Sequence, residues 1–300
     1  MTHISTTYAA LKQRLDEGKT VLIDGGTGTE LERRGATMVE GAWCGDGGLS
    51  EPELLQQIHE DYIKLGSQVI VANTFASSRH ICEQGGFGDR FESANRSSVA
   101  AAKRARDAVG SVVIAGSVSS THQGGPQPPL DVAARNHADQ AAILADEGCD
   151  LLIAEMMRDV DHTNTLLDAI RPAGLPIWVG FTVANRDGHM WMYEDEMSFA
   201  DGLAKIDLSG VDVVAIMHSE VEDVDPALDV LADVWSGPTG VYAQTGTFIP
   251  PNWQFIDMIS PGDYTSAVER WAARGVQVLG GCCGIGPEHI AHMAEVLPES

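Results

Sequence analysis

The 300-residue sequence has little positive charge: 19 Lys and Arg residues stand against 43 Asp and Glu residues, which gives a formal charge of −24. Nucleic acids and anionic membranes both require a basic face on their partner, so neither is expected to bind this chain. No apolar run approaches the ~18 residues of a membrane-spanning helix. The N-terminus also lacks the basic start and apolar run of a secretory signal.

Cysteine is scarce as well. The five cysteines are odd in number, and their spacing is not that of a disulfide framework. A reducing cytoplasm is therefore the expected compartment.

What the sequence does contain is a repeated alternation of short apolar runs and helical patterns. With 44% hydrophobic residues the chain can bury a full-size core. The apolar runs are rich in Val, Ile and Leu with little alternation, which is typical of parallel strands that are buried on both faces. The eight runs cover residues 21–24, 68–73, 112–118, 150–155, 177–183, 211–217, 240–244 and 276–280.

The intervening segments carry apolar residues at helical spacing. They cover residues 52–65, 91–109, 131–147, 159–170, 197–206, 226–235, 264–273 and 287–297. Eight strand–helix units predict a (β/α)8 TIM barrel of the α/β class, formed as one domain over residues 1–300. A doubly wound sheet remains the alternative, because periodicity does not show whether a sheet closes.

In such a barrel the catalytic groups lie at the C-terminal ends of the strands. The polar residues at these ends combine carboxylates with soft metal ligands from strands that are distant in sequence. They are Asp24, Asn73, Thr74, Glu155, Thr182, His218, Gln244, Cys282 and Cys283.

The most informative segment is Gly280-Gly281-Cys282-Cys283-Gly284. Neighbouring residues of a regular strand point to opposite faces, but flanking glycines release the backbone from that alternation. Both sulfurs could then turn toward one metal ion at the barrel mouth. Zn²⁺ prefers thiolate and imidazole ligands, and a catalytic zinc keeps one position open. The alternatives are two small buried side chains or a vicinal disulfide.

The chain resembles the zinc-dependent homocysteine S-methyltransferases, which include the betaine–homocysteine and S-methylmethionine–homocysteine enzymes. The resemblance spans nearly the whole chain, and its most specific part is Gly281-Cys282-Cys283-Gly284. It also rests on residues 24–31, Trp43, Pro52-Glu53, His59, Tyr62, Gly66, Asn73-Thr74-Phe75, Gly116-Ser117, Ala154-Glu155, Pro287 and His289.

The resemblance implies a (β/α)8 barrel in which three cysteines hold Zn²⁺. It implies that the thiol of homocysteine, or of a close analogue, takes a methyl group from a sulfonium or quaternary ammonium donor, so that methionine is formed. Such an enzyme belongs to methionine biosynthesis and to the EC 2.1.1 class. It also implies that the segment with Asp24, Gly25 and Gly26, together with Glu155, binds the amino acid.

The sequence departs from the family at one expected ligand. His218 stands where the third cysteine is expected, just after the sixth strand. Imidazole is a good zinc ligand, so His218, Cys282 and Cys283 are the predicted metal site. A Cys₂His site carries one more positive charge than a three-thiolate site, which should make a bound thiolate less nucleophilic. If the imidazole does not reach the metal, the site is weak or lost.

The remaining predicted roles concern the two small-molecule substrates. Glu155, assisted by Asp24, should bind the ammonium of the amino acid, and backbone N–H groups of Gly25, Gly26 and the Asn73-Thr74-Phe75 loop its carboxylate. Aromatic faces bind a cationic donor. The candidates are Trp43, Phe75, Trp191, Tyr193, Tyr242 and Trp253, with residues 186–196 as a lid.

Two other functions fit the same residues. The barrel could bind an amino acid or methylated solute without catalysis, or it could be a metal-assisted lyase that uses Asp24, Glu155 and His218. The sequence does not reveal whether the chain forms a homo-oligomer, which methyl donor it uses or which thiol is its acceptor.

Overall fold

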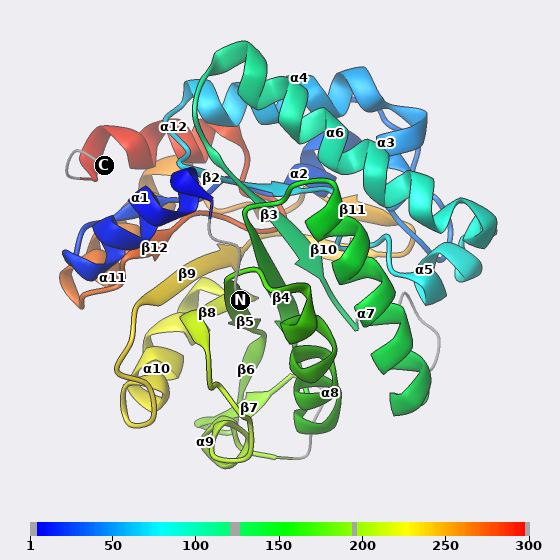
Figure 1. Cartoon of the computed structure of the whole chain (residues 1–300). Coiled ribbons are helices and arrows are strands. Elements are labelled where there is room, and N and C mark those ends of the chain that lie inside the picture. The colour runs from blue at the N-terminus through cyan, green and yellow to red at the C-terminus, as the bar shows by residue number, and fades with distance from the viewer. Residues whose placement is uncertain (1–4, 121–126, 194–196, 298–300) are drawn as a thin grey trace.

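Eight parallel strands form the centre of the protein (Figure 1). The computed structural model describes residues 5–120, 127–193 and 197–297. The strands follow one another in the order β1-β12-β9-β8-β5-β4-β3-β2. The two ends of this order meet through a parallel bridge between Ile23 and Val69 and a 2.7 Å hydrogen bond from the Gln68 N–H to the Leu22 carbonyl. The sheet therefore closes, which confirms the (β/α)8 barrel and excludes the doubly wound alternative.

Each of the eight barrel strands overlaps one of the eight apolar runs. They are β1 (Val21–Leu22), β2 (Val69–Ala72), β3 (Val113–Val118), β4 (Leu151–Met157), β5 (Ile177–Phe181), β8 (Val211–Glu220), β9 (Thr239–Gln244) and β12 (Val278–Leu279). The larger helices around them are α1 (Thr6–Asp16), α4 (Pro52–Lys64), α6 (Phe91–Val109), α7 (Leu130–Asp146), α8 (Val160–Ile170), α10 (Val221–Ala232), α11 (Pro261–Ala273) and α12 (Pro287–Val296).

The strands are buried on both faces because one face of the sheet packs inside the barrel and the other packs against the helices. On β3, Val113 and Ala115 join the cluster inside the barrel, whereas Ile114 joins the cluster between the sheet and the helices. Helix α1 belongs to the inner cluster through Tyr8, whose hydroxyl donates a 2.6 Å hydrogen bond to Asp212. This helix therefore closes the N-terminal end of the barrel and leaves the C-terminal end for a site.

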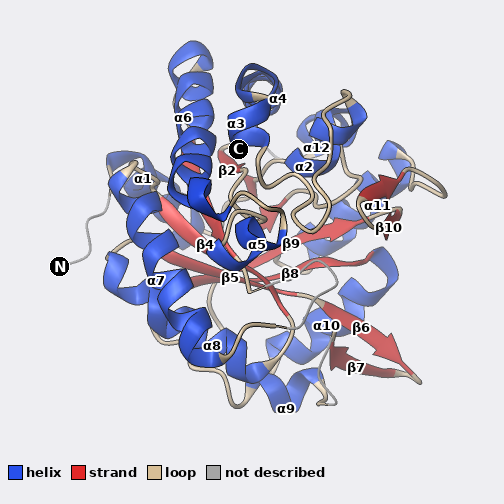
Figure 2. Ribbon diagram, turned by 90° about the vertical axis from the view of Figure 1, so that its right-hand side faces the viewer, coloured by secondary structure: helices blue, strands red, loops and turns tan. Residues whose placement is uncertain are grey.

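Several short elements at the C-terminal end were not predicted from the sequence. Two antiparallel hairpins, β6 (Val183–Arg186) with β7 (His189–Met192) and β10 (Thr247–Ile249) with β11 (Asn252–Gln254), extend beyond the barrel, and Figure 2 shows β6 and β7 projecting from the helical layer. The short helices α2 (Thr27–Arg33), α3 (Gly47–Ser50) and α5 (Arg79–Gln84) and the 3-10 turn η1 (Gly88–Arg90) were not predicted either, nor was the 3-10 turn η2 (Arg171–Ala173) between α8 and β5. Helix α9 (Phe199–Leu203) lies within the predicted helix of residues 197–206.

Two further observations bear on the predictions. Strand β8 continues to Glu220 instead of ending at Met217, so His218 lies inside the strand. Residues 194–196 of the predicted lid lie outside the described residues. Within the part of the chain that is described, no helix is both long enough and apolar enough to cross a membrane.

Candidate metal centre and substrate cavity

A cavity of about 480 Å³ opens at the C-terminal end of the barrel. Its walls come from the ends of β1, β2, β4, β8 and β9, from the Cys282–Cys283 loop after β12, and from the β10–β11 hairpin. Most of the predicted site residues line it: Asp24, Gly25, Gly26, Trp43, Asn73, Phe75, Glu155, Tyr193, His218, Tyr242, Trp253, Cys282 and Cys283. The sequence therefore identified residues from strands far apart in the chain that the fold gathers around one space.

The three predicted metal ligands converge in this cavity. The Cys282 Sγ lies 3.4 Å from the His218 Nδ1 and 4.0 Å from the Cys283 Sγ, and one ligand atom from each residue lies within 4.8 Å of the others. Tetrahedral zinc with ordinary bond lengths places two sulfurs about 3.8 Å apart and a sulfur and an imidazole nitrogen about 3.6 Å apart. The residues present therefore fit a tetrahedral ion with three protein ligands.

The chemistry of the thiols also fits a cation. The adjacent Cys283 thiol, together with burial, raises the pKa of the Cys282 thiol well above its usual range, while His218 acts in the opposite direction. Thiolates are the metal-binding form, and a bound ion supplies the positive charge that stabilises them. The Cys282 thiol, which resists ionisation, lies beside a second thiol and an imidazole, and a divalent metal bound by this set would deprotonate it.

Hydrogen bonds to α2 hold the cysteine loop in place. The Thr29 hydroxyl accepts a 3.1 Å bond from the Gly284 N–H and donates a 2.9 Å bond to the Gly26 carbonyl. Gly284 has a φ of +79°, and a Cβ on it would lie 2.2 Å from the Thr245 carbonyl oxygen, so only glycine fits. This left-handed residue turns the chain away from the β12 direction directly after the two sulfurs.

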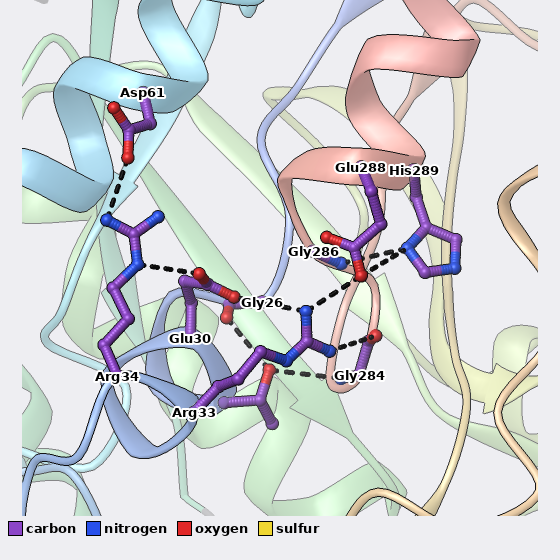
Figure 3. Close-up of polar contacts among 10 residues, drawn as sticks. Gly26, Glu30, Arg33, Arg34, Asp61, Gly284, Gly286, Glu288 and His289 are labelled. Carbon is purple, nitrogen blue, oxygen red and sulfur yellow. Dashed lines mark hydrogen bonds and ion pairs between the residues drawn. The ribbon is translucent and has the colours of Figure 1, made fainter.

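Charged side chains close the same loop from outside (Figure 3). Arg33 on α2 pairs with Glu288 on α12 at 2.9 Å and donates a 3.4 Å hydrogen bond to the Gly284 carbonyl. The His289 Nδ1 accepts a 3.3 Å hydrogen bond from the Gly286 N–H. The loop that carries the sulfurs is thus fixed between two helices.

His218 reaches the sulfurs because β8 is distorted at that point. The pairing of β8 with β9 shifts register between Met217 and Glu220, and His218 has a φ of +46°, which is uncommon for a residue with a side chain. The imidazole also meets the edge of Trp253, with ring centroids 6.1 Å apart. A regular strand would not place the ring in this way.

Glu155 lies near the end of β4 and is only 7% exposed. The Ser117 hydroxyl donates a short hydrogen bond to its carboxylate. Burial raises the pKa of Glu155 to about 7, although Ser117 and His218 act in the opposite direction. A buried carboxylate of this kind is stabilised by a cation, so Glu155 can bind an ammonium group.

Thr74 does not line the cavity. Its hydroxyl accepts a 3.0 Å hydrogen bond from the Ser117 N–H and donates a 2.8 Å bond to the Ser117 carbonyl, so it holds the residue that contacts Glu155. The Thr74 N–H is bonded to the Ala72 carbonyl, and the Asn73 side chain is bonded to the Cys44 carbonyl at 2.8 Å. These two residues position others rather than offering those groups to a ligand.

Asp24 and the glycines after it pack against the cysteine loop. The Asp24 carboxylate accepts a 2.9 Å hydrogen bond from the Val71 N–H, and burial raises its pKa well above its usual range. A Cβ on Gly26 would lie 2.6 Å from the Cys282 carbonyl oxygen, so glycine allows this close approach. The Gly26 N–H already donates to the Ile285 carbonyl at 2.9 Å.

An aromatic wall runs from the first loop to the metal ligands. Trp43 meets Phe248 edge-on at 6.0 Å, Phe248 stacks on Trp253 at 6.1 Å, and Trp253 meets His218. Tyr242 also lines the cavity, and burial, followed by the charge of Glu155, raises the pKa of its phenol. Trp191 does not line the cavity, because its indole packs within the β6–β7 hairpin, 6.0 Å below the Arg186 guanidinium.

Comparison with known proteins identifies the family. A family model described as homocysteine S-methyltransferase matches residues 21–297. The chain belongs to the homocysteine S-methyltransferase family. It is 26% identical over 317 residues to a selenocysteine methyltransferase of Astragalus bisulcatus, an alignment that covers 93% of each chain. It is 25% identical over 307 residues to the homocysteine S-methyltransferase of Escherichia coli, covering 94% of this chain and 96% of that protein.

A solved structure supports the fold. The metallated form of the Escherichia coli homocysteine methyltransferase MmuM superposes with a TM-score of 0.77 at 23% sequence identity, over 97% of this chain and 99% of that one. Membership of the homocysteine S-methyltransferase family confirms the prediction of a methyltransferase of the EC 2.1.1 class.

Several lining residues of this family member were missed from the sequence. Thr27 lies 8% exposed in the cavity wall, and its hydroxyl has no hydrogen-bond partner among the described residues. Phe248, Arg158 and Met156 also line the cavity. The aromatic hairpin sequence around Phe248 was a usable signal, and Thr27 lies in the segment of residues 24–31 on which the family resemblance rests, whereas nothing in the local sequence marks Arg158.

Proposed function

We propose that this chain transfers a methyl group from a sulfonium or quaternary ammonium donor to the thiol of homocysteine or a close analogue and forms methionine. Zn²⁺ is the proposed metal, with His218, Cys282 and Cys283 as its ligands. The observation that carries the proposal is the convergence of these three ligand atoms within 4.8 Å on a cavity that also contains the buried Glu155.

When bound, zinc would supply the positive charge that keeps the acceptor sulfur in its nucleophilic thiolate form. The protein side chains orient the two substrates. Glu155 accepts the ammonium of the amino acid. Asp24 is close enough for the charge of Glu155 to act on it, and it assists. The Thr27 hydroxyl, which has no hydrogen-bond partner among the described residues, donates to the carboxylate of the amino acid.

The aromatic wall has a separate role toward the donor. The faces of Trp43, Phe248 and Trp253 attract a fixed positive charge, and attraction of this kind strengthens where water is excluded. Holding a methyl-bearing cation near a fixed sulfur converts an encounter of two solutes into a reaction between neighbours. The barrel holds the residues that bind the donor cation and the acceptor sulfur in fixed positions.

The test is metal analysis combined with methyl transfer. Wild-type protein should bind zinc and transfer a deuterated methyl group from at least one of S-methylmethionine and betaine to homocysteine, with methionine detected by mass spectrometry. Cys282→Ser should lose both the metal and the turnover. Cys149→Ser, at a buried cysteine that does not line the cavity, is the matched control and should lose neither.

Methylation of homocysteine at an undiminished rate by metal-free protein would contradict the proposal. Calorimetric binding of the amino acid or a methylated solute with no product from any donor would favour a non-catalytic binding protein instead. An acceptor panel should include selenocysteine, because one similar protein carries that name.

A further inference from the structure

The two tryptophans of the aromatic wall bind one carboxylate. Glu32 on α2 does not line the cavity, but it accepts hydrogen bonds from both of them. The Trp43 indole N–H donates a 3.2 Å bond to the carboxylate, and the Trp253 backbone N–H lies 3.0 and 3.1 Å from its two oxygens. The Asn252 side chain adds a 2.7 Å bond. Glu32 therefore connects α2 with the first loop and with the β10–β11 hairpin.

One face of α2 receives the Trp43 indole. Gly28 and Glu32 are four residues apart, so they lie on the same face of the helix. A Cβ on Gly28 would lie 2.5 Å from the Cη2 atom of the indole, so glycine leaves the room that the ring occupies. Glu32 accepts the N–H at the other side of the same ring system. The indole of Trp43, which is only 7% exposed, is thus fixed by two contacts from one helix.

The negative charge of Glu32 is not neutralised by an ion pair. All of its hydrogen-bond donors are neutral N–H groups, and no Lys, Arg or His among the described residues lies within 4.0 Å of its carboxylate. The charged residues next to it on α2 are paired (Figure 3). Arg34 contacts Glu30 at 2.7 Å, and Arg33 contacts Glu288 at 2.9 Å. Glu32 therefore remains free to attract a cation beyond the two tryptophans.

We propose that Glu32 is the counter-charge of the donor site. The inference rests on the proposed function, in which the aromatic wall attracts the fixed positive charge of the donor. Because Glu32 binds Trp43 and Trp253 without lining the cavity, it acts on the donor through these residues and through its electric field. Aromatic faces attract a cation through their quadrupole, and a carboxylate bonded to them adds a full negative charge. Glu32 is a positioning residue that makes the wall prefer a cation to a neutral group of the same shape.

The experiment compares a cation with its uncharged isostere. Choline and 3,3-dimethylbutan-1-ol have nearly the same shape, but the alcohol has a carbon atom in place of the quaternary nitrogen. Their dissociation constants are measured with zinc-loaded protein by ligand-observed NMR titration. Glu32→Gln removes the charge and keeps an oxygen that accepts hydrogen bonds, whereas Glu32→Asp keeps the charge. Glu269→Gln, at an exposed position on α11, is the control with the same change in net charge.

Wild type should bind choline at least about fivefold more tightly than the alcohol, and Glu32→Gln should lose most of this preference, as expected when one charge near the cation is removed. Glu32→Gln should bind the alcohol within about twofold of wild type, because the neutral probe does not respond to the charge. Glu32→Asp should keep part of the preference, and Glu269→Gln should keep all of it. Equal losses for both probes in Glu32→Gln would overturn the proposal in favour of a structural role. An unchanged preference in Glu32→Gln would overturn it as well.

A second variant tests the charge with Glu32 left in place. Asn252 is exposed, and its side chain already reaches Glu32. Asn252→Lys brings an ammonium group to the same carboxylate, so it should lower the preference for choline as Glu32→Gln does. This variant decides the question if Glu32→Gln does not fold. An unaltered preference in Asn252→Lys would contradict the proposal.

Failure of the proposed function gives a different result, because these binding measurements need no turnover. If wild type transfers no methyl group from any donor, the methyltransferase proposal fails, while a preference for choline that is lost in Glu32→Gln still supports the counter-charge. If wild type is active but binds both probes equally, only the counter-charge is overturned. In active protein, Glu32→Gln should raise the KM for the donor and leave the KM for homocysteine unchanged.

Discussion

His59 should make the protein sensitive to acid. This residue of α4 is completely buried, and neither ring nitrogen has a hydrogen-bond partner among the described residues. Burial lowers its pKa to about 4, because a charged imidazole loses its hydration there. In the unfolded chain the pKa is about 6.5. The folded state therefore resists a proton that the unfolded state accepts.

The direction and size of the effect follow from proton linkage. Because the folded pKa is lowered, the contribution of His59 is complete above the unfolded pKa and is lost as the pH falls from about 6.5 toward 4. At pH 5 the loss relative to pH 7.5 is about 2 kcal/mol for this residue. His137, whose pKa burial lowers to about 3, should add a similar loss. Together these are large beside a typical total stability of about 5–15 kcal/mol.

Urea unfolding at pH 7.5 and pH 5.0 tests this. His59→Gln, which cannot take up a proton, should show a fall in the free energy of unfolding between the two pH values that is about 2 kcal/mol smaller than that of wild type. His292→Gln, at an exposed position on α12, is the control and should match wild type, because its imidazole meets water in both states. An unchanged pH dependence in His59→Gln would refute the reasoning.

Four other predictions follow from the site and the charge. His218→Ala should weaken zinc binding by more than the roughly 10–100-fold that is lost when a group hydrogen-bonded to a metal ligand is removed, and His218→Cys should restore it, as measured by chelator competition; equal affinities of wild type and His218→Ala would remove the imidazole from the ligand set. Thr29→Val should lower zinc affinity by about 10–100-fold, since it removes the hydroxyl that accepts the hydrogen bond from the Gly284 N–H and is itself oriented by the Gly26 carbonyl, and an unaltered affinity would show that the loop needs no such support. Glu155→Gln should raise the KM for homocysteine roughly 30-fold or more and leave the donor KM unchanged; a change confined to the donor KM would reverse the roles of the two subsites. Raising the salt concentration from 0.05 to 1 M should increase Tm, because a formal charge of −24 repels itself less when it is screened, and a constant Tm would indicate that the charges already lie too far apart to interact.

The barrel could be predicted because its strands are buried on both faces. Within the run 150–155, for example, residues 151–154 are all Leu, Ile or Ala, and this pattern is present in the sequence whatever the loops do. Closure of the sheet could not be predicted, because it depends on the bridge between Ile23 and Val69, where neither residue differs from those of an open sheet. The β10–β11 hairpin was missed because its strands have only three residues each, with mixed exposure.

Within the site, the sequence identified side-chain chemistry better than side-chain direction. Sulfur and imidazole at strand ends predicted a metal site, and the three ligand atoms do converge. Thr74 and Trp191 were expected to face ligands, but one is bonded to Ser117 and the other packs against Arg186. The partner that such a side chain contacts depends on which groups lie nearest to it after folding, and a local sequence pattern does not contain that information.

The distorted backbone around the cavity explains how one histidine can stand where a cysteine is expected. Of the five non-glycine residues with positive φ among those described, three line the cavity: Trp43, Met156 and His218. Each costs about 1–3 kcal/mol, which only a rigid surrounding structure can sustain. Imidazole is longer than a thiol side chain, so a ring at the position of a cysteine meets the metal only if the backbone moves or turns. The left-handed turn at His218, against the ring of Trp253, provides that adjustment and keeps the Nδ1 atom 3.4 Å from the Cys282 sulfur.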